Sequence, residues 1–428
     1  MSKGNKVFYG WWIVLVAFLS IALTYGTKGV FGVVQMQMLD DLHWTRGSIA
    51  GALSANMLVY AIAAPFVGRF MDKIGIKVVM IVGALFTGAA FLLSATVTNP
   101  WQFYIYYGFL LGLANTGMGM IPGPTAVSRW FIKKRGRALS IALVASPLGT
   151  AIFTFVARDL LKTIGWKGLF VVMGLAVWVL LILPVYFIMR SSPEEMGLQP
   201  DGKSQPMEAP DGKAAAAAPS ASSIMREEQW TLSKLLSSPK AWCIIFGYFV
   251  FAGNGWAQQV HQVPHLMQMG LSKDAATVAL GMNMTLAVIS MLAWPSISDF
   301  MKRSTAILVS LLVQAAATFI LLKANTMVMT YAFVLIMGLT YFGGYGLFSA
   351  LAADTFGRRS LGTVNGLMAM VGAAGAAAGI YAGGLLYDIT GNYGLLWQIG
   401  AAALVIAAIL IVVLEKMPQR SAAAAKTL

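Results

Sequence analysis

Twelve apolar stretches, each long enough to cross a lipid bilayer, constrain this chain more than any other feature of its sequence. A helix rises about 1.5 Å per residue, so about 20 apolar residues cross the roughly 30 Å of hydrocarbon in a membrane. The composition agrees, because 58% of the 428 residues are hydrophobic and 11% are charged, whereas soluble domains carry about 25% charged residues. We therefore predict an all-α integral membrane protein with twelve transmembrane helices. These are expected near residues 11–35, 46–70, 78–98, 101–128, 138–161, 166–189, 241–268, 275–298, 304–323, 327–353, 361–387 and 393–415.

The basic residues predict the orientation of these helices. The formal net charge is +14, but Lys and Arg are scattered between apolar stretches instead of clustering on a soluble face, which argues against a nucleic-acid partner. Cytoplasmic loops of membrane proteins collect Lys and Arg. Placing both termini inside puts 23 of the 30 basic residues on the inner side. We expect both termini to be cytoplasmic and the protein to reside in a bacterial inner (plasma) membrane.

The chain also repeats itself. Asp72 follows the second stretch and Asp299 follows the eighth, 227 residues later, and the pairs 133–134 and 358–359 are both basic. The segment between the sixth and seventh stretches contains Pro, Gly and five consecutive Ala, a composition typical of a flexible linker. We therefore predict two homologous six-helix halves, residues 1–190 and 241–428, joined by a cytoplasmic linker over 191–240.

The loop after the second stretch carries a recognisable motif. Its residues Gly68, Asp72, Lys73, Gly75 and Lys77 resemble the signature G-x-x-x-D-[RK]-x-G-x-[RK] of the major facilitator superfamily. The resemblance implies the pseudo-symmetric major facilitator fold and a function in transport. It also implies that Asp72 latches the halves together with a basic residue at the end of the fourth helix. The implied cytoplasmic gate consists of Gly68, Asp72, Lys73, Gly75, Arg129 and Asp299.

Within this superfamily, residues 9–12, 23–31 and 354–366 resemble the monocarboxylate transporters and the oxalate/formate antiporters. In the animal monocarboxylate transporters a lysine at the Lys28 position carries protons and substrate, so the resemblance implies that role for Lys28. Those proteins also place an aspartate and an arginine in helix 8, where this chain has Ser290 and Trp294. The expected function is proton-coupled transport of a small organic carboxylate by alternating access. An exporter of neutral or apolar compounds is the alternative.

Ionisable groups inside a membrane usually mark function, because burying them costs several kcal/mol. None of the sixteen acidic residues falls in the middle of a predicted helix. Lys28 could bind an anion, or its stem could extend toward the membrane surface. His261 and His265 lie four residues apart and could accept protons or simply satisfy polar groups near Pro264. No third ligand accompanies them, so we predict neither a metal nor a cofactor, and Cys243 has no second thiol.

Neutral polar side chains complete the predicted cavity. Each could bind substrate or hold helices together. The candidates are Asn115, Asn254, Asn283, Trp294, Tyr341, Tyr345 and Asn365. No nucleophile–base pair or phosphate-binding glycine loop is present, so we do not expect an enzyme. The expected partners are a small-molecule substrate, a proton and membrane lipid, with the monomer as the functional unit.

Overall fold

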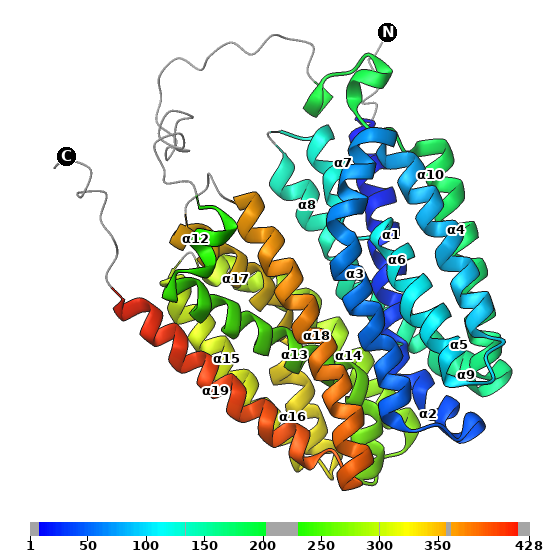
Figure 1. Cartoon of the computed structure of the whole chain (residues 1–428), viewed down its shortest axis with the longest axis vertical. Coiled ribbons are helices and arrows are strands. Elements are labelled where there is room, and N and C mark those ends of the chain that lie inside the picture. Colours follow the sequence, from blue (N-terminus) through cyan, green and yellow to red (C-terminus); the bar gives the residue numbers. More distant parts are fainter. Residues whose placement is uncertain (1–7, 133, 203–229, 299, 357–360, 418–428) are drawn as a thin grey trace.

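The structure, a computed structural model, describes residues 8–132, 134–202, 230–298, 300–356 and 361–417, and every regular element in this part of the chain is helical (Figure 1). The elements before the linker are α1 (Gly10–Gly29), α2 (Phe31–Leu42), α3 (Arg46–Ile74), α4 (Ile76–Ser94), α5 (Pro100–Phe103), η1 (Tyr104–Leu110), α6 (Leu111–Thr116), α7 (Pro122–Trp130), α8 (Arg135–Leu143), α9 (Ala145–Val177), η2 (Trp178–Ile182) and α10 (Leu183–Ile188). Those after it are α13 (Pro239–Gln268), α14 (Lys273–Ile297), α15 (Arg303–Leu322), α16 (Met327–Gly338), α17 (Tyr341–Phe356), α18 (Leu361–Thr390) and α19 (Gly394–Lys416).

By length and composition, nine helical runs among the described residues could cross a membrane. One of them, Gly136–Ile188, has 53 residues, or about 80 Å of helix, which is too long for one crossing. The backbone reverses inside it at Gly165, whose φ of 66° is one that glycine adopts readily. This run therefore makes two crossings. With the broken fourth helix and α13 added, the arrangement contains the twelve expected spans.

The two ends of the bundle are called here the linker face and the far face. At the linker face α3 turns into α4 and α13 begins, whereas at the far face α2 turns into α3 through residues 43–45. The linker face is at the top of Figure 1. Gly75 connects α3 to α4 with a φ of 90°, a conformation that glycine adopts far more readily than other residues.

The same close helix crossing occurs once in each half. A side chain on Gly26 of α1 would begin 3.0 Å from the Gly149 carbonyl oxygen on α9, and one on Gly253 of α13 would begin 2.8 Å from the Gly375 carbonyl oxygen on α18. Gly26 and Gly253 are 227 residues apart, and Gly149 and Gly375 are 226 apart. Small residues let helix backbones approach closely in lipid. The repeat seen in the sequence is thus present in the packing of the two pseudo-symmetric halves.

Three details differ from the sequence-based expectations. The fourth helix is not continuous, because the chain turns between α6 and α7, where Gly119 has φ 68°. The tenth is divided into α16 and α17 at Leu339 and Thr340. The linker predicted over 191–240 contains short helices at its described ends, namely η3 (Pro193–Met196), η4 (Pro200–Gly202) and α12 (Leu232–Leu236), and Asp201 accepts hydrogen bonds from the Ile132 and Lys134 amides.

Candidate functional site

Lys28 lies in the last turn of α1, close to Val30, through which the helix continues into α2. Its side chain is 6% exposed. The ammonium nitrogen lies 4.7 Å from the ring centroid of Tyr60 on α3 and 6.0 Å from that of Tyr25. Among the described residues it has no carboxylate or hydrogen-bond partner, and it is not fully enclosed by protein atoms. The structure thus holds a buried cation against aromatic rings with its hydrogen-bonding capacity unused.

Aromatic side chains continue from Lys28 into the other half. The ring of Tyr25 is 6.4 Å from that of Trp256 on α13, and Trp256 in turn interacts with the Tyr345 hydroxyl. The hydroxyl oxygens of Tyr341 and Tyr345 are 2.6 Å apart, which is a hydrogen bond. The ring of Tyr341 packs directly against Gly255, where any side chain would collide with it. Of the predicted residues, Lys28, Tyr341 and Tyr345 are therefore linked by one chain of aromatic contacts, which we call the aromatic wall: Tyr25, Tyr60, Trp256, Tyr341 and Tyr345.

Trp294 and Ser290 fasten α14 to the break between α16 and α17. The Trp294 indole N–H donates to the Leu339 carbonyl at 2.8 Å, and the Gly343 amide donates to Ser290 Oγ at 2.9 Å. The ring of Trp294 packs directly against Gly343. The two residues that replace the charged pair of the resembled transporters thus satisfy backbone groups that the helix break frees.

The two histidines each bridge α13 to another helix. Nε2 of His261 lies 2.9 Å from the Ile380 carbonyl oxygen on α18, and Nε2 of His265 lies 2.8 Å from the Leu321 carbonyl oxygen on α15. Both side chains are at most 2% exposed, and both Nδ1 atoms are enclosed without a partner. Each Nε2 therefore carries the proton that it donates to a carbonyl oxygen.

The predicted asparagines lie elsewhere in the bundle. Asn115 in α6 is fully buried, and both of its amide atoms lack a hydrogen bond. Asn254 points toward Gly400 of α19, and Asn283 in α14 is 2% exposed. The side chain of Asn365 lies outside the described residues. No hydrogen bond between described residues joins these asparagines to Lys28.

The two halves are joined at the far face by a set of contacts that we call the far-face clamp: Arg46, Gly47, Tyr387, Asp388 and Tyr393. The Asp388 carboxylate accepts hydrogen bonds from the Arg46 amide at 3.0 Å and the Gly47 amide at 2.7 Å. The Arg46 guanidinium lies 3.8 Å from the Tyr387 ring centroid and donates to the Tyr393 hydroxyl at 2.6 Å. An acidic group at a helix N-terminus is favourable, and here the helix belongs to the opposite half.

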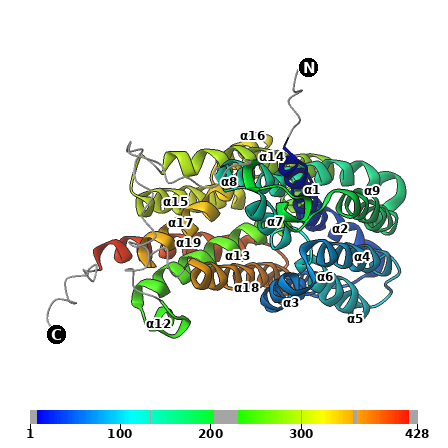
Figure 2. The ribbon, with the colours of Figure 1, turned by 90° about the horizontal axis from the view of Figure 1, so that it is seen from above.

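Deeper contacts between the halves lie on the same side of the bundle. Ser54 Oγ of α3 donates to the Ala377 carbonyl of α18 at 2.9 Å, and Gln35 donates to the Val260 carbonyl. Further toward the linker face, side chains on Gly68 and Gly366 would meet nothing within 4 Å. The helices α3 and α18 lie side by side in both views and separate toward the linker face in Figure 1 (Figures 1 and 2). The described residues thus close the far face.

The predicted gate falls partly outside the described residues. Asp299 lies in a gap, and the side chain of Asp72 is not described although its backbone belongs to α3. Lys73 is exposed in the last turn of α3, Gly75 ends that helix, and Arg129 lies in the last turn of α7.

Tyr25, Tyr60 and Trp256 belong to the site but were not singled out from the sequence. Tyr25 could have been found, because it precedes Lys28 by three residues and so shares its helix face. Tyr60 and Trp256 lie on other helices, and no local spacing connects them to Lys28. Asp388 and Arg46 were not predicted either, because 342 residues separate them in the sequence.

Comparisons with known proteins agree with this architecture. A family model described as Major Facilitator Superfamily matches residues 16–380. The chain is 29% identical over 166 residues to monocarboxylate transporter 14 of Homo sapiens, and the match covers 39% of this chain but only 32% of that transporter. It is 24% identical over 395 residues to the oxalate:formate antiporter of Oxalobacter formigenes, covering 91% of this chain and 86% of that protein.

Solved structures share the fold at low sequence identity. The nucleoside transporter NupG superposes with a TM-score of 0.72 at 13% identity, covering 96% of this chain and 100% of that one. A bacterial homologue of the human lysosomal transporter Spinster, in an inward-facing and unoccupied conformation, superposes with a TM-score of 0.67 at 15% identity, covering 97% of this chain and 96% of that one.

Proposed function

The chain belongs to the major facilitator superfamily, and on that premise we propose that it carries a small organic carboxylate across the membrane by alternating access, coupled to a proton. The observation that supports this proposal most is the Lys28 ammonium, which is buried among aromatic rings without an anionic partner. A carboxylate ligand supplies that partner. The names of two relatives, a monocarboxylate transporter and an oxalate:formate antiporter, favour the same class of ligand.

The proposed binding mode follows from the two kinds of group at the site. The substrate carboxylate pairs with Lys28, and its organic part lies against the aromatic wall on the side of Trp256 and Tyr345. Pairing the charges reduces the cost of enclosing them when the cavity closes. Because Lys28 and Trp256 belong to different halves, a bound substrate contacts both and stabilises the closed intermediate.

We place the coupled proton on Lys28 or on the carboxylate itself. His261 and His265 are less suitable carriers, because each donates its Nε2 proton to a backbone carbonyl and encloses its Nδ1 atom. We further propose that residues 1–190 and 241–428 move as the two rocking units and that the linker face is cytoplasmic. The structure then corresponds to a state that is closed toward the outside.

Uptake into proteoliposomes tests the assignment. With an imposed inward proton gradient, a panel of labelled monocarboxylates is offered to the wild type, Lys28→Gln, Lys28→Arg and Lys167→Gln. Lys167 is the matched control, because it is a lysine on the far-face side of α9 that stacks on Trp166, 5.4 Å away, and lies outside the central site. We expect gradient-driven accumulation in the wild type and in Lys167→Gln, its loss in Lys28→Gln, and partial retention in Lys28→Arg. Unchanged accumulation in a correctly folded Lys28→Gln would refute the assignment.

Export of neutral or apolar compounds is the second candidate function. The aromatic wall favours it, because aromatic rings bind apolar ligands without a charged partner. Susceptibility of a deletion strain to a panel of hydrophobic toxicants separates the two. An exporter raises resistance whether or not Lys28 carries a charge, whereas a carboxylate carrier leaves resistance unchanged.

A further inference from the structure

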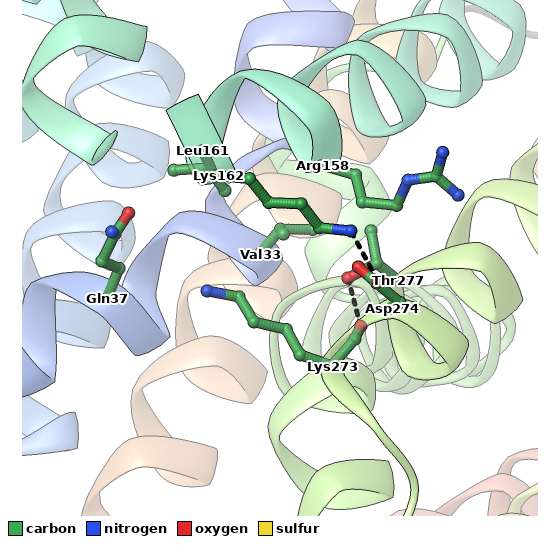
Figure 3. A pocket seen from close by; sticks show the side chains of 8 residues that line it. All are labelled: Val33, Gln37, Arg158, Leu161, Lys162, Lys273, Asp274 and Thr277. Carbon is green, nitrogen blue, oxygen red and sulfur yellow. Dashed lines mark hydrogen bonds and ion pairs between the residues drawn. The ribbon is translucent and has the colours of Figure 1, made fainter. Parts of the chain in front are cut away.

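A cavity lies at the far face, between the two halves and apart from Lys28 (Figure 3). It has a volume of about 240 Å³, and its wall comes from α2, α9 and α14. The charged and polar side chains in that wall are Gln37, Arg158, Lys162, Lys273 and Asp274. Because α14 belongs to the other half, this cavity exists in this form only while the far face is closed.

Cations outnumber anions around this cavity. Its one carboxylate, on Asp274, pairs with Lys162 at 2.5 Å, and Arg158 pairs with Asp159 at 2.9 Å. Lys273 is partly buried and has no anionic partner among the described residues. The cavity therefore keeps one uncompensated ammonium and a positive local field.

Gln37 supplies a neutral donor on the opposite wall. Its side-chain amide forms no hydrogen bond within the described residues; its oxygen is enclosed, whereas its nitrogen is not. In Figure 3 the Lys273 ammonium extends toward Gln37, while the Arg158 guanidinium points away from it. A donor from each half thus faces the same space.

The internal repeat explains why Lys273 has no anionic partner among the described residues. Lys273 follows Arg46 by 227 residues, and Asp388 follows Lys162 by 226, so the two contacts are related by the pseudo-symmetry. In the far-face clamp, the Asp388 carboxylate and the Tyr393 hydroxyl lie beside Arg46. In the contact around Lys273, Lys162 occupies the position of that carboxylate. Lys273 therefore lacks the acidic partner that Arg46 has.

We propose that this cavity is a second anion site, in which a small carboxylate or inorganic oxyanion bridges Lys273 and Gln37 with Lys162 nearby. The bound anion occupies the role that Asp388 has in the related contact. Because its ligands belong to both halves, it stabilises the state in which the far face is closed. The site is independent of Lys28 and of the substrate proposed for it.

Thermal unfolding in a zwitterionic buffer of low ionic strength tests anion binding, with sodium sulfate and sodium acetate as probes and sodium chloride at equal ionic strength as the reference. All variants carry Lys28→Gln, so that the central lysine contributes nothing. We expect at least one probe to raise Tm beyond the chloride reference in this background and with Lys167→Gln added. Adding Lys273→Gln or Gln37→Ala is expected to weaken the apparent affinity at least tenfold. A sulfate-specific shift identifies an inorganic oxyanion, and an acetate-specific shift identifies a carboxylate.

A distance measurement tests the bridging role. Spin labels are placed at Thr98→Cys and Asn325→Cys, both exposed at the far face, after the buried Cys243 is replaced by Ala. The probe anion should shift the distance distribution toward the closed far face, and Lys273→Gln should abolish that shift. An anion effect that persists in Lys273→Gln, or that sodium chloride reproduces, overturns the proposal. Loss of uptake in Lys28 variants has no bearing on either measurement.

Discussion

Asp388, at the end of α18, caps the beginning of α3 in the other half, because its carboxylate oxygen accepts a hydrogen bond from the backbone amide of Arg46 at 3.0 Å. The cap is intramolecular, but in the proposed alternating-access cycle its two components separate when the far face opens. A carboxylate usually stabilises the helix that follows it in sequence. Here it stabilises the contact between the two halves instead.

Replacing Asp388 with Asn should therefore shift the conformational equilibrium toward an open far face. The substitution removes the charge from two amide contacts, and hydrogen bonds to charged groups are worth about 1.5–3 kcal/mol. We expect the closed-to-open ratio to fall about tenfold or more. Spin-label distances between Thr98→Cys and Asn325→Cys report that ratio. The control is Asp354→Asn, because Asp354 pairs with Arg303 inside one half at 2.9 Å. Identical distributions in Asp388→Asn and the wild type would contradict the clamp.

Tyr60 should contribute to carboxylate binding through its ring. Tyr60→Phe keeps the ring beside the Lys28 ammonium, whereas Tyr60→Leu removes it. Cation–π contacts are worth about 0.5–2 kcal/mol, so we expect KM for the substrate to rise about 2- to 30-fold in the Leu variant and little in the Phe variant. Uptake kinetics in proteoliposomes measure this. Equal KM values in the two variants would show that the ring is not needed.

The histidines should matter for stability more than for coupling. His261→Phe and His265→Phe remove the donor to the Ile380 and Leu321 carbonyls, which should cost about 1–3 kcal/mol of stability each. Glutamine can still donate, so His→Gln variants should recover part of the loss. We expect the dependence of uptake on the proton gradient to persist in folded Phe variants. Uptake that no longer responds to the gradient in these variants would indicate that a histidine carries the coupled proton.

The paired helix crossings should respond alike to added volume. Alanine at Gly149 collides with the Ala22 backbone, and alanine at Gly375 collides with the Phe249 backbone. Overpacking of this kind costs about 1–3 kcal/mol, so we expect both variants to have a lower Tm than the wild type. Gly136→Ala is the control, since its added methyl group meets nothing within 4 Å and the residue lies inside α8. A lower Tm in only one half would show that the crossings are not equivalent.

The sequence predicted the architecture well because its signals are local and repeated. Each spanning stretch is recognisable on its own, and the spacing between Asp72 and Asp299 revealed the repeat that Gly149 and Gly375 reproduce in three dimensions. The broken tenth helix was missed because no proline marks it. Trp294, 45 residues away in the sequence, compensates the break by donating a hydrogen bond to the Leu339 carbonyl.

The site was harder to predict, because its contacts cross between helices. Lys28 stood out as an isolated cation, and Tyr341 and Tyr345 as a pair on one helix face. That Tyr60 lies beside Lys28 depends on how α3 packs against α1, which no short-range pattern encodes. The same holds for Asp388, whose partners are 341 and 342 residues away.

The antiparallel pairing of α3 and α18 has a mechanical consequence. The pair touches at Ser54 and Ala377, with the far-face clamp at one end and the end of α3 that carries Asp72 at the other. In the proposed rocking motion, two helices that touch at this point act as a lever, so widening one end narrows the other. The energy that releases Asp388 is then offset by whatever forms at the opposite end. If the halves rock as proposed, the bound substrate needs to supply only the small difference in free energy between the two closed ends.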